Sequence, residues 1–325
     1  MLLTVRDLTF RFRGQPNDVV QNVSFTLKRN ETLCIVGESG CGKSVTALAL
    51  MGLLLRDEVR IGGGEIGFLG ETFPADAFDR IAQFRGDELA MIFQEPMTSL
   101  NPVLRIGEQI AEAVVRHRRC SREEAGARAL EMLRRVGIPA AEQRMGEYPH
   151  QLSGGMRQRV MIAMALANEP SVLLADEPTT ALDVTVQAQV LDLIAELQAE
   201  TGMGMILITH DLGVVAEVAT DVAVMYAGHI VEYGSAADIF DDPQHPYTIG
   251  LMSSVPRLTG PRQRLSTVPG MVPTVAAMPP GCRFSTRCPF AAPVCATLPP
   301  FAEVGPGHRA ACHFAPLDQT LELSA

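Results

Sequence analysis

The chain has 325 residues, 47% of them hydrophobic and 20% charged, a composition typical of a folded protein with one or two domains. A formal charge of −10, from 27 basic and 37 acidic side chains, argues against a dedicated nucleic-acid-binding protein. The longest apolar runs, such as residues 45–55, are shorter than the roughly 18–20 residues that cross a membrane. Arg6 and Asp7 interrupt the first ten residues, so we expect neither a membrane helix nor a signal peptide.

The predicted elements alternate between strands and helices along the chain. Residues 1–36 show apolar alternation and end in the apolar run 33–36, which predicts strands. A glycine-rich segment then leads into a predicted helix from Lys43 to about Leu54, and a second apolar run follows at 89–93. The region 105–168 has apolar residues at helical spacing, and the apolar runs 172–175 and 205–208 flank a predicted helix at 184–199. This order predicts an α/β fold with a parallel sheet buried on both faces.

The glycine-rich segment matches the phosphate-binding pattern G-x-x-x-x-G-K-[ST] between a strand and a helix. Its residues are Gly37, Glu38, Ser39, Gly40, Cys41, Gly42, Lys43 and Ser44. The glycines let backbone N–H groups turn toward a phosphate, and the following helix adds its N-terminal partial charge. We expect Lys43 to reach the β- and γ-phosphates and Ser44 to bind Mg²⁺. Cys41 occupies a free position, where we expect alkylation to block nucleotide binding by bulk alone.

A pair of carboxylates follows the apolar strand 172–175 and completes the expected nucleotide site. Asp176 can hold Mg²⁺ through water, and Glu177 can act as the general base that polarises the attacking water. An apolar strand that ends in acidic residues is common by chance. The position of this pair about 130 residues after the phosphate-binding pattern strengthens the interpretation.

Between these two motifs the segment 152–158 resembles the signature sequence of the ATP-binding cassette (ABC) superfamily. The other motifs of that family occur in order, at Phe12, Gln94, Asp183 and His210. The resemblance implies that Ser153, Gly154 and Gly155 face the γ-phosphate held by a second subunit, so that ATP is sandwiched between two cassettes. It implies further that Gln94 contacts Mg²⁺ and the attacking water and that His210 contacts the γ-phosphate. Asp183 would organise the dimer interface, and Phe12 would stack on adenine, although Phe10 alternates into the same region.

Longer stretches resemble one branch of this superfamily, the ATPase subunits of bacterial oligopeptide and dipeptide importers, and most of all the dipeptide type. The stretches are 90–102, 148–156, 175–185, 225–228 and 245–248, and the resemblance covers about residues 3–315. It implies a RecA-like core with an antiparallel β subdomain and a helical subdomain at about 95–168, together forming a nucleotide-binding domain over 1–235. After about residue 235 prolines become frequent and the periodicity fades, which predicts an irregular, cysteine-containing extension over 236–325.

The same resemblance implies an ATPase that energises peptide import from the cytoplasmic face of the membrane. The expected partners are a second ABC ATPase forming a heterodimer, two transmembrane permeases and an extracytoplasmic peptide-binding protein, with no nucleic acid. Nickel importers share many of these sequence motifs, so an ATPase for nickel or another small solute is the alternative.

Four of the seven cysteines lie in the last 44 residues, at Cys282, Cys288, Cys295 and Cys312. None of their spacings is the short C-x₂₋₄-C of a typical zinc site, and cluster sites also often use C-x₂-C. Spacing therefore leaves an iron–sulfur cluster, zinc and unliganded thiols open. The family resemblance implies a [4Fe–4S] cluster with a structural role. Three arginines beside the cysteines could offset the charge of a cluster or could be solvated, namely Arg283, Arg287 and Arg309.

Overall fold

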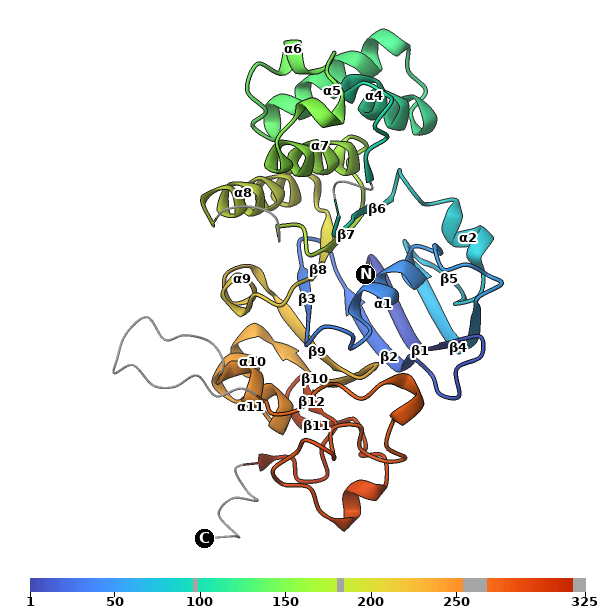
Figure 1. The fold of residues 1–325 in the computed structure, drawn as a ribbon, viewed down its shortest axis with the longest axis vertical. Helices are drawn as coiled ribbons and strands as arrows, with labels where there is room; N and C mark the ends of the chain where they lie inside the picture. The colour runs from blue at the N-terminus through green and yellow to red at the C-terminus, as the bar shows by residue number, and fades with distance from the viewer. Residues whose placement is uncertain (96–98, 180–183, 254–267, 318–325) are drawn as a thin grey trace.

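The computed structural model of the chain describes residues 1–95, 99–179, 184–253 and 268–317. Its centre is an eight-stranded sheet with the strand order β11-β12-β10-β9-β3-β8-β7-β6 (Figure 1). Neighbouring strands from β9 to β6 run parallel, whereas β10, β11 and β12 pair antiparallel. The parallel part consists of β3 (Thr32–Val36), β6 (Leu89–Ile92), β7 (Val172–Asp176), β8 (Gly204–Ile208) and β9 (Asp221–Tyr226). The predicted α/β fold with a parallel sheet is confirmed.

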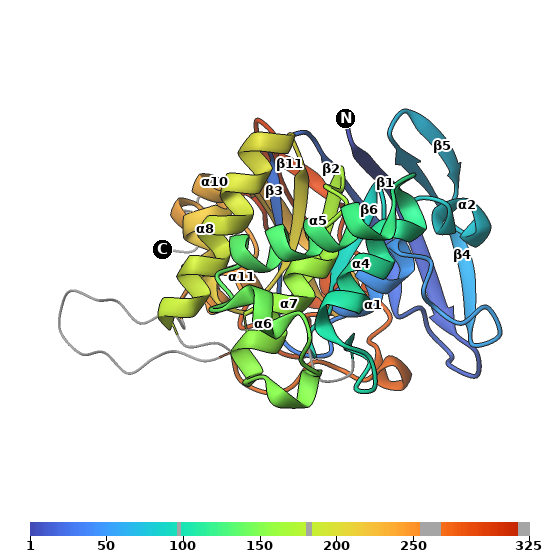
Figure 2. The same cartoon turned by 90° about the horizontal axis from the view of Figure 1, so that it is seen from above.

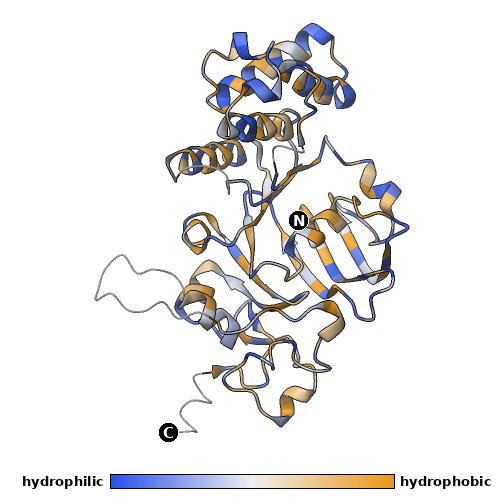
Figure 3. Cartoon of the chain, in the orientation of Figure 1, coloured by the Kyte–Doolittle hydropathy of each residue, from blue (hydrophilic) through white to orange (hydrophobic). Residues whose placement is uncertain are grey.

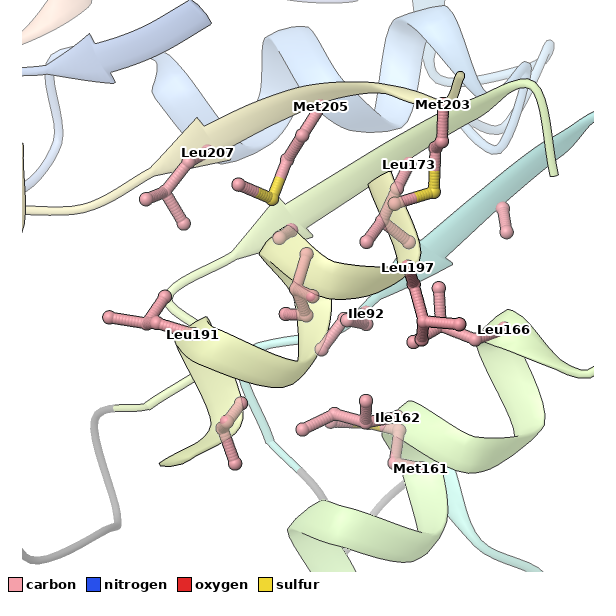
Figure 4. Packing of buried hydrophobic residues seen from close by; sticks show 14 of the residues in the cluster. Ile92, Met161, Ile162, Leu166, Leu173, Leu191, Leu197, Met203, Met205 and Leu207 are labelled. Atoms are coloured by element: carbon pink, nitrogen blue, oxygen red, sulfur yellow. The ribbon is translucent and has the colours of Figure 1, made fainter. Parts of the chain in front are cut away.

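The parallel strands are buried along their whole length because the side chains on both faces of the sheet pack into a hydrophobic core. On β3, Cys34 and Val36 join one hydrophobic cluster, whereas Leu33 and Ile35 join a second cluster on the other face. Figure 4 shows the first cluster, in which Leu173 and Met205 from the sheet meet helices α7 (Gly154–Leu166) and α8 (Val184–Thr201). Continuous apolar runs without alternation are the expected sequence signal of such strands.

The second face of the parallel sheet packs against a separate four-stranded antiparallel sheet with the order β2-β1-β4-β5. Figure 2 shows its strands β1, β4 and β5 to one side of the helical layer. The strands are β1 (Leu3–Phe12), β2 (Val20–Leu27), β4 (Val59–Phe68) and β5 (Glu71–Pro74), and helix α2 (Phe78–Ala82) follows them. The sequence analysis did not predict β4 and β5, because the three glycines at 62–64 interrupt the apolar alternation on which strand prediction depends.

The helical part lies above the open edge of the parallel sheet in Figure 1 and consists of α4 (Ile106–His117), α5 (Arg122–Arg135), α6 (Ala141–Arg144) and α7. Helix α5 begins with a capping box, in which Ser121 accepts a hydrogen bond from the Glu124 N–H and the Glu124 carboxylate accepts one from the Ser121 N–H. In Figure 3 blue residues are frequent on the outer helices of this part, and orange residues line the sheet. None of the described helices is long and apolar enough to cross a bilayer.

The part after residue 235 is joined to the edge of the large sheet. Strand β12 (His308–Ala310) pairs with β10 (His229–Ser235), and β11 (Ala302–Gly305) pairs with β12. The remaining helices are α1 (Lys43–Leu50), α9 (Leu212–Val218), α10 (Ala236–Asp241) and α11 (Pro246–Met252), with 3₁₀ turns at Pro149–Gln151, Val275–Ala277 and Pro293–Ala296. Tyr247 and Phe284 contribute their rings to the core cluster that also contains the sheet residues Cys34 and Val36. The C-terminal part therefore shares the core of the sheet.

A buried ion pair ties this part to β10. The Glu232 side chain is 0% exposed, and its carboxylate accepts hydrogen bonds from the backbone N–H groups of Gln244 and His245. The imidazole Nε2 of His308 on β12 lies 2.8 Å from Glu232 Oε1. The hydrogen bond to this carboxylate raises the pKa of His308 above its usual 6.5, so the imidazolium is favoured in the folded state.

A raised folded-state pKa means that this pair stabilises the fold fully below pH 6.5 and that its contribution is lost as the pH rises through the folded-state value. Replacing His308 by Gln leaves the buried carboxylate without its cation, and we expect a loss of about 3 kcal/mol at pH 6. The measurement is chemical denaturation of both proteins between pH 6 and pH 9. The difference between wild type and His308→Gln should shrink with rising pH, and a constant difference would contradict the ion pair.

Candidate nucleotide site at the carboxyl ends of the parallel strands

The loop from Gly37 to Ser44 connects the end of β3 to the start of α1. Gly37 fits only as glycine, because a Cβ atom there would lie 2.2 Å from the carbonyl oxygen of Met225. Gly42 has a φ of +107° at the N-cap of α1, a conformation that L side chains rarely adopt. The two glycines thus let the loop turn tightly against the strand and enter the helix, as the predicted phosphate-binding loop requires.

The side chain of Lys43 folds back over this loop and is 6% exposed. Its ammonium donates hydrogen bonds to the carbonyl oxygens of Gly37 at 2.8 Å and of Glu38 at 3.0 Å. A positive charge therefore lies at the centre of the loop, next to the N-terminus of α1 with its partial positive charge. Both features attract an anion of the size of a phosphate group.

Ser44 and Asp176 bring two oxygen ligands together from distant parts of the chain. The Ser44 hydroxyl donates a hydrogen bond to Asp176 Oδ1 at 3.1 Å, which links the first turn of α1 to the end of β7. Burial raises the pKa of Asp176, although the hydrogen bond from Ser44 opposes this shift. A hydroxyl next to a buried carboxylate is a donor set that suits Mg²⁺, and a cation there would offset the cost of burying the carboxylate charge.

Glu177 follows β7, and its carboxylate is held between two side chains that follow β6 and β8, the strands on either side of β7. Gln94 Nε2, two residues after β6, donates to Glu177 Oε2 at 3.0 Å, and His210 Nδ1, two residues after β8, lies 3.1 Å from Glu177 Oε1. Glu177 has a φ of +47°, a strained backbone conformation for a non-glycine residue that is often found at functional sites. An amide, a carboxylate and an imidazole in contact can orient a water molecule and take up its proton.

The signature residues lie elsewhere in the chain. Ser153 caps helix α7, and its hydroxyl accepts the N–H of Met156 at 3.3 Å. Ser153 and Gly154 are exposed, and α7 belongs to the helical part, separate from α1 in Figure 1. Within the described ranges none of the hydrogen bonds of Ser153 reaches the loop Gly37–Ser44. Asp183, the other predicted interface residue, lies outside the residues that the structure describes.

The structure separates the roles of the two aromatic residues on β1. Phe10 is 0% exposed and belongs to the core beneath the antiparallel sheet. Phe12 is half-buried and lines a shallow pocket together with Gly14, Gln15 and Val59. Of the two, therefore, Phe12 is the aromatic side chain that a ligand can reach.

The four-cysteine metal site predicted from the sequence is not seen among the described residues and stays a prediction. Among the residues described, no group of three or more His, Cys, Asp or Glu side chains is placed to hold a metal ion. Burial raises the pKa values of Cys282, Cys312 and Cys288, the last to about 11, which keeps these thiols protonated. A backbone hydrogen bond from Cys282 N–H to the carbonyl oxygen of Cys295, at 2.9 Å, joins two of the cysteine segments directly.

The structure gives the three arginines beside the cysteines contacts that the sequence analysis did not predict. Arg283 donates to the carbonyl oxygen of Ala227 and to Gln21 Oε1. Arg309 lies over the rings of Tyr233 and Phe301. Arg287 forms an ion pair with Glu38 of the glycine-rich loop, a contact that the sequence analysis missed because 249 positions separate the two residues.

Comparisons with known proteins agree with this geometry. The family described as ABC transporter matches residues 20–180, and the family described as the C-terminal region of oligopeptide/dipeptide transporters matches residues 231–295. The chain is 49% identical over 322 residues to the oligopeptide transport ATP-binding protein OppD of Escherichia coli, with 98% of this chain and 95% of that protein covered. It is 51% identical to a Brucella melitensis protein named as a peptide import ATP-binding protein, with 96% of each covered.

Among solved structures, the fold is similar to that of the ATP-binding cassette MJ0796, determined as a dimer in a post-hydrolysis state bound to ADP and Pi. The TM-score is 0.64 at 28% identity, and the match covers 72% of this chain and 99% of the other. The match thus spans almost the whole of that cassette and leaves about a quarter of this chain unmatched.

The buried position of Cys41 changes the expected outcome of alkylation. Its side chain is 1% exposed, and burial raises the pKa of its thiol, so both access and thiolate population are low. We expect iodoacetamide to modify half-buried Cys120 first and to leave Cys41 unmodified until the protein is unfolded. Mass spectrometry of the two tryptic peptides measures this order. Rapid labelling of Cys41 in the folded protein would contradict the structure.

Proposed function

The chain belongs to the ATP-binding cassette family of transporter ATPases. From this premise we propose the roles of its residues in ATP binding and hydrolysis. It is an ATPase that energises a peptide importer. One observation carries this conclusion. The same chain contains the glycine-rich loop with its contacts to the strand ends and a region that matches the C-terminal region of oligopeptide and dipeptide transporters. The second candidate function is that of an ATPase that energises the import of nickel or another small solute.

In this proposal the loop Gly37–Ser44 binds the phosphates of ATP. The backbone N–H groups of the loop and the first turn of α1 surround the β-phosphate, and Lys43 contacts the β- and γ-phosphates from its place over the loop. Ser44, Asp176 and Gln94 would hold Mg²⁺, which when bound neutralises phosphate charge. Phe12 stacks on the adenine, which its half-buried position at a pocket supports.

Hydrolysis is assigned to the side chains around Glu177. Its carboxylate acts as the general base for the attacking water, because its side chain lies at a strand end next to Gln94 and His210 and is 14% exposed. Gln94 and His210 fix the orientation of the carboxylate, and His210 contacts the γ-phosphate. The 63% exposure of the His210 side chain leaves room for that contact.

The signature residues complete the site of a second cassette. Ser153, Gly154 and Gly155 lie at the start of helix α7, where Ser153 and Gly154 are exposed. We therefore place them against the γ-phosphate bound by a partner ATPase, with Asp183 at the interface. ATP binding then closes the dimer, and loss of the γ-phosphate reopens it. The partner is a related ATPase in a heterodimer, which works at the cytoplasmic face of the membrane with two permeases and an extracytoplasmic peptide-binding protein.

We expect Glu177→Gln to bind Mg²⁺–ATP with nearly wild-type affinity and to lose hydrolysis by about 10²–10⁴-fold, because an amide cannot take the proton of water. Phosphate release at saturating ATP and equilibrium dialysis with labelled ATP measure the two properties. Glu217→Gln, which removes the same charge from an exposed position on α9, serves as the control and should hydrolyse normally. Turnover of Glu177→Gln within threefold of wild type would remove Glu177 from the role of base.

We also propose that Cys282, Cys288, Cys295 and Cys312 bind a [4Fe–4S] cluster with a structural role, zinc being the alternative. The support is the arrangement of backbone donors: the N–H groups of Phe284, Phe290 and Phe314 donate to the sulfurs of the cysteines two positions earlier. Such N–H to sulfur hydrogen bonds stabilise thiolate ligands. The sulfurs are also near enough to raise one another's pKa, so a cation among them would favour their thiolate forms.

Anaerobic purification should therefore yield a coloured protein with about four iron atoms per chain. We expect Cys288→Ser to lower the iron content, whereas Cys120→Ser, which alters a cysteine of the helical part, should keep it. Metal analysis and the visible absorption spectrum measure both. A colourless protein with zinc would replace the cluster by the alternative, and a protein with neither metal would leave four free thiols.

A further inference from the structure

The C-terminal part of the chain holds the phosphate-binding loop at Glu38. The backbone N–H of Glu38 donates to the hydroxyl of Tyr247, on helix α11, at 2.8 Å. The Glu38 carboxylate accepts two parallel hydrogen bonds from the Arg287 guanidinium, at 2.9 and 3.0 Å. The Glu38 carbonyl oxygen accepts from the Lys43 ammonium. All three polar parts of this residue are therefore bonded, two of them to groups more than 200 positions away.

Arg287 is itself held in place before it reaches the loop. Its side chain is 4% exposed, and its other N–H groups donate to the carbonyl oxygens of Pro269 at 2.8 Å and Val268 at 3.0 Å. Its guanidinium also lies over the ring of Tyr226, 5.6 Å from the centroid. A guanidinium fixed by carbonyl groups and a ring presents its remaining N–H pair in one orientation, and this suits a carboxylate.

The loop needs such external support because its own sequence gives it little. Gly37, Gly40 and Gly42 all have positive φ, and glycine has more backbone freedom than any other residue. Ser39 and Gly40 are exposed, so side-chain packing does not restrain them. In the glycine-flanked first half of the loop, residues 37–40, Glu38 is the residue whose side chain is anchored outside the loop. Its position sets where the following N–H groups point.

From these contacts we propose that Arg287 and Tyr247 are positioning residues for ATP binding. They hold Glu38 and thereby keep the loop in the conformation that receives the phosphates. The C-terminal part is then a component of the nucleotide site of its own chain. This inference rests on the proposed assignment of Gly37–Ser44 as the phosphate-binding loop.

The test compares Mg²⁺–ATP affinity and ATPase kinetics of the full-length protein and its variants. Arg287→Met keeps the length of the side chain and removes both charged hydrogen bonds; we expect the Kd and the KM for ATP to rise about tenfold while kcat changes less than threefold. Arg287→Lys should recover part of the affinity. Because Glu38→Gln already breaks the pair, adding Arg287→Met to it should weaken binding by less than twofold more.

Arg283→Met is the matched control, since Arg283 is also buried and also anchors the C-terminal part, but through Ala227 and Gln21 instead of the loop. It should keep the wild-type Kd. A Kd of Arg287→Met within twofold of wild type, or an equal loss in Arg283→Met, would overturn the positioning role. If Arg287→Met does not fold, Tyr247→Phe decides by the same Kd criterion. Failure of the wild type to bind Mg²⁺–ATP would instead refute the proposed function.

Discussion

The burial of the parallel sheet on both faces is the constraint on which the site depends. Strands β3, β7 and β8 have no exposed residue along their length, so polar side chains can lie only where the strands end. Four such ends meet at one edge and supply Lys43, Gln94, Glu177 and His210. Ligands of open α/β sheets bind at the carboxyl ends of the strands for this reason. The apolar core thereby positions the polar chemistry without taking part in it.

The C-terminal part also contributes to the edge of the sheet where the parallel strands end. It is fixed to the sheet by the pairing of β12 with β10 and by the buried pair of Glu232 and His308. From this base it extends Arg287 to Glu38 in the glycine-rich loop. A loop that must approach a phosphate with its backbone cannot be filled with bulky side chains, and its rigidity has to come from neighbouring parts of the fold. The contact between Arg287 and Glu38 thus connects the C-terminal part to the glycine-rich loop of the cassette.

The motifs of the nucleotide site could be predicted because each one is local. The pattern from Gly37 to Ser44 needs only the conformations of adjacent residues, and Asp176 and Glu177 need only the end of one strand. The choice between Phe10 and Phe12 could not be made from alternation, because it depends on which residue the neighbouring strands cover. For Arg287 the sequence analysis considered a role at the neighbouring cysteines, whereas its partner in the structure is Glu38 in the loop.

The sequence by itself thus determined the fold class and the family, and it predicted the groups to which we assign ATP binding and hydrolysis, because these follow from short-range pattern and from the burial of apolar strands. Only the tertiary structure decided which groups touch one another: Ser44 with Asp176, Gln94 and His210 with Glu177, and Arg287 with Glu38. Within the described residues, it gives Ser153 no hydrogen bond to the loop of its own chain. Such contacts join residues that are distant in sequence, and their geometry is set by the packing of the whole core.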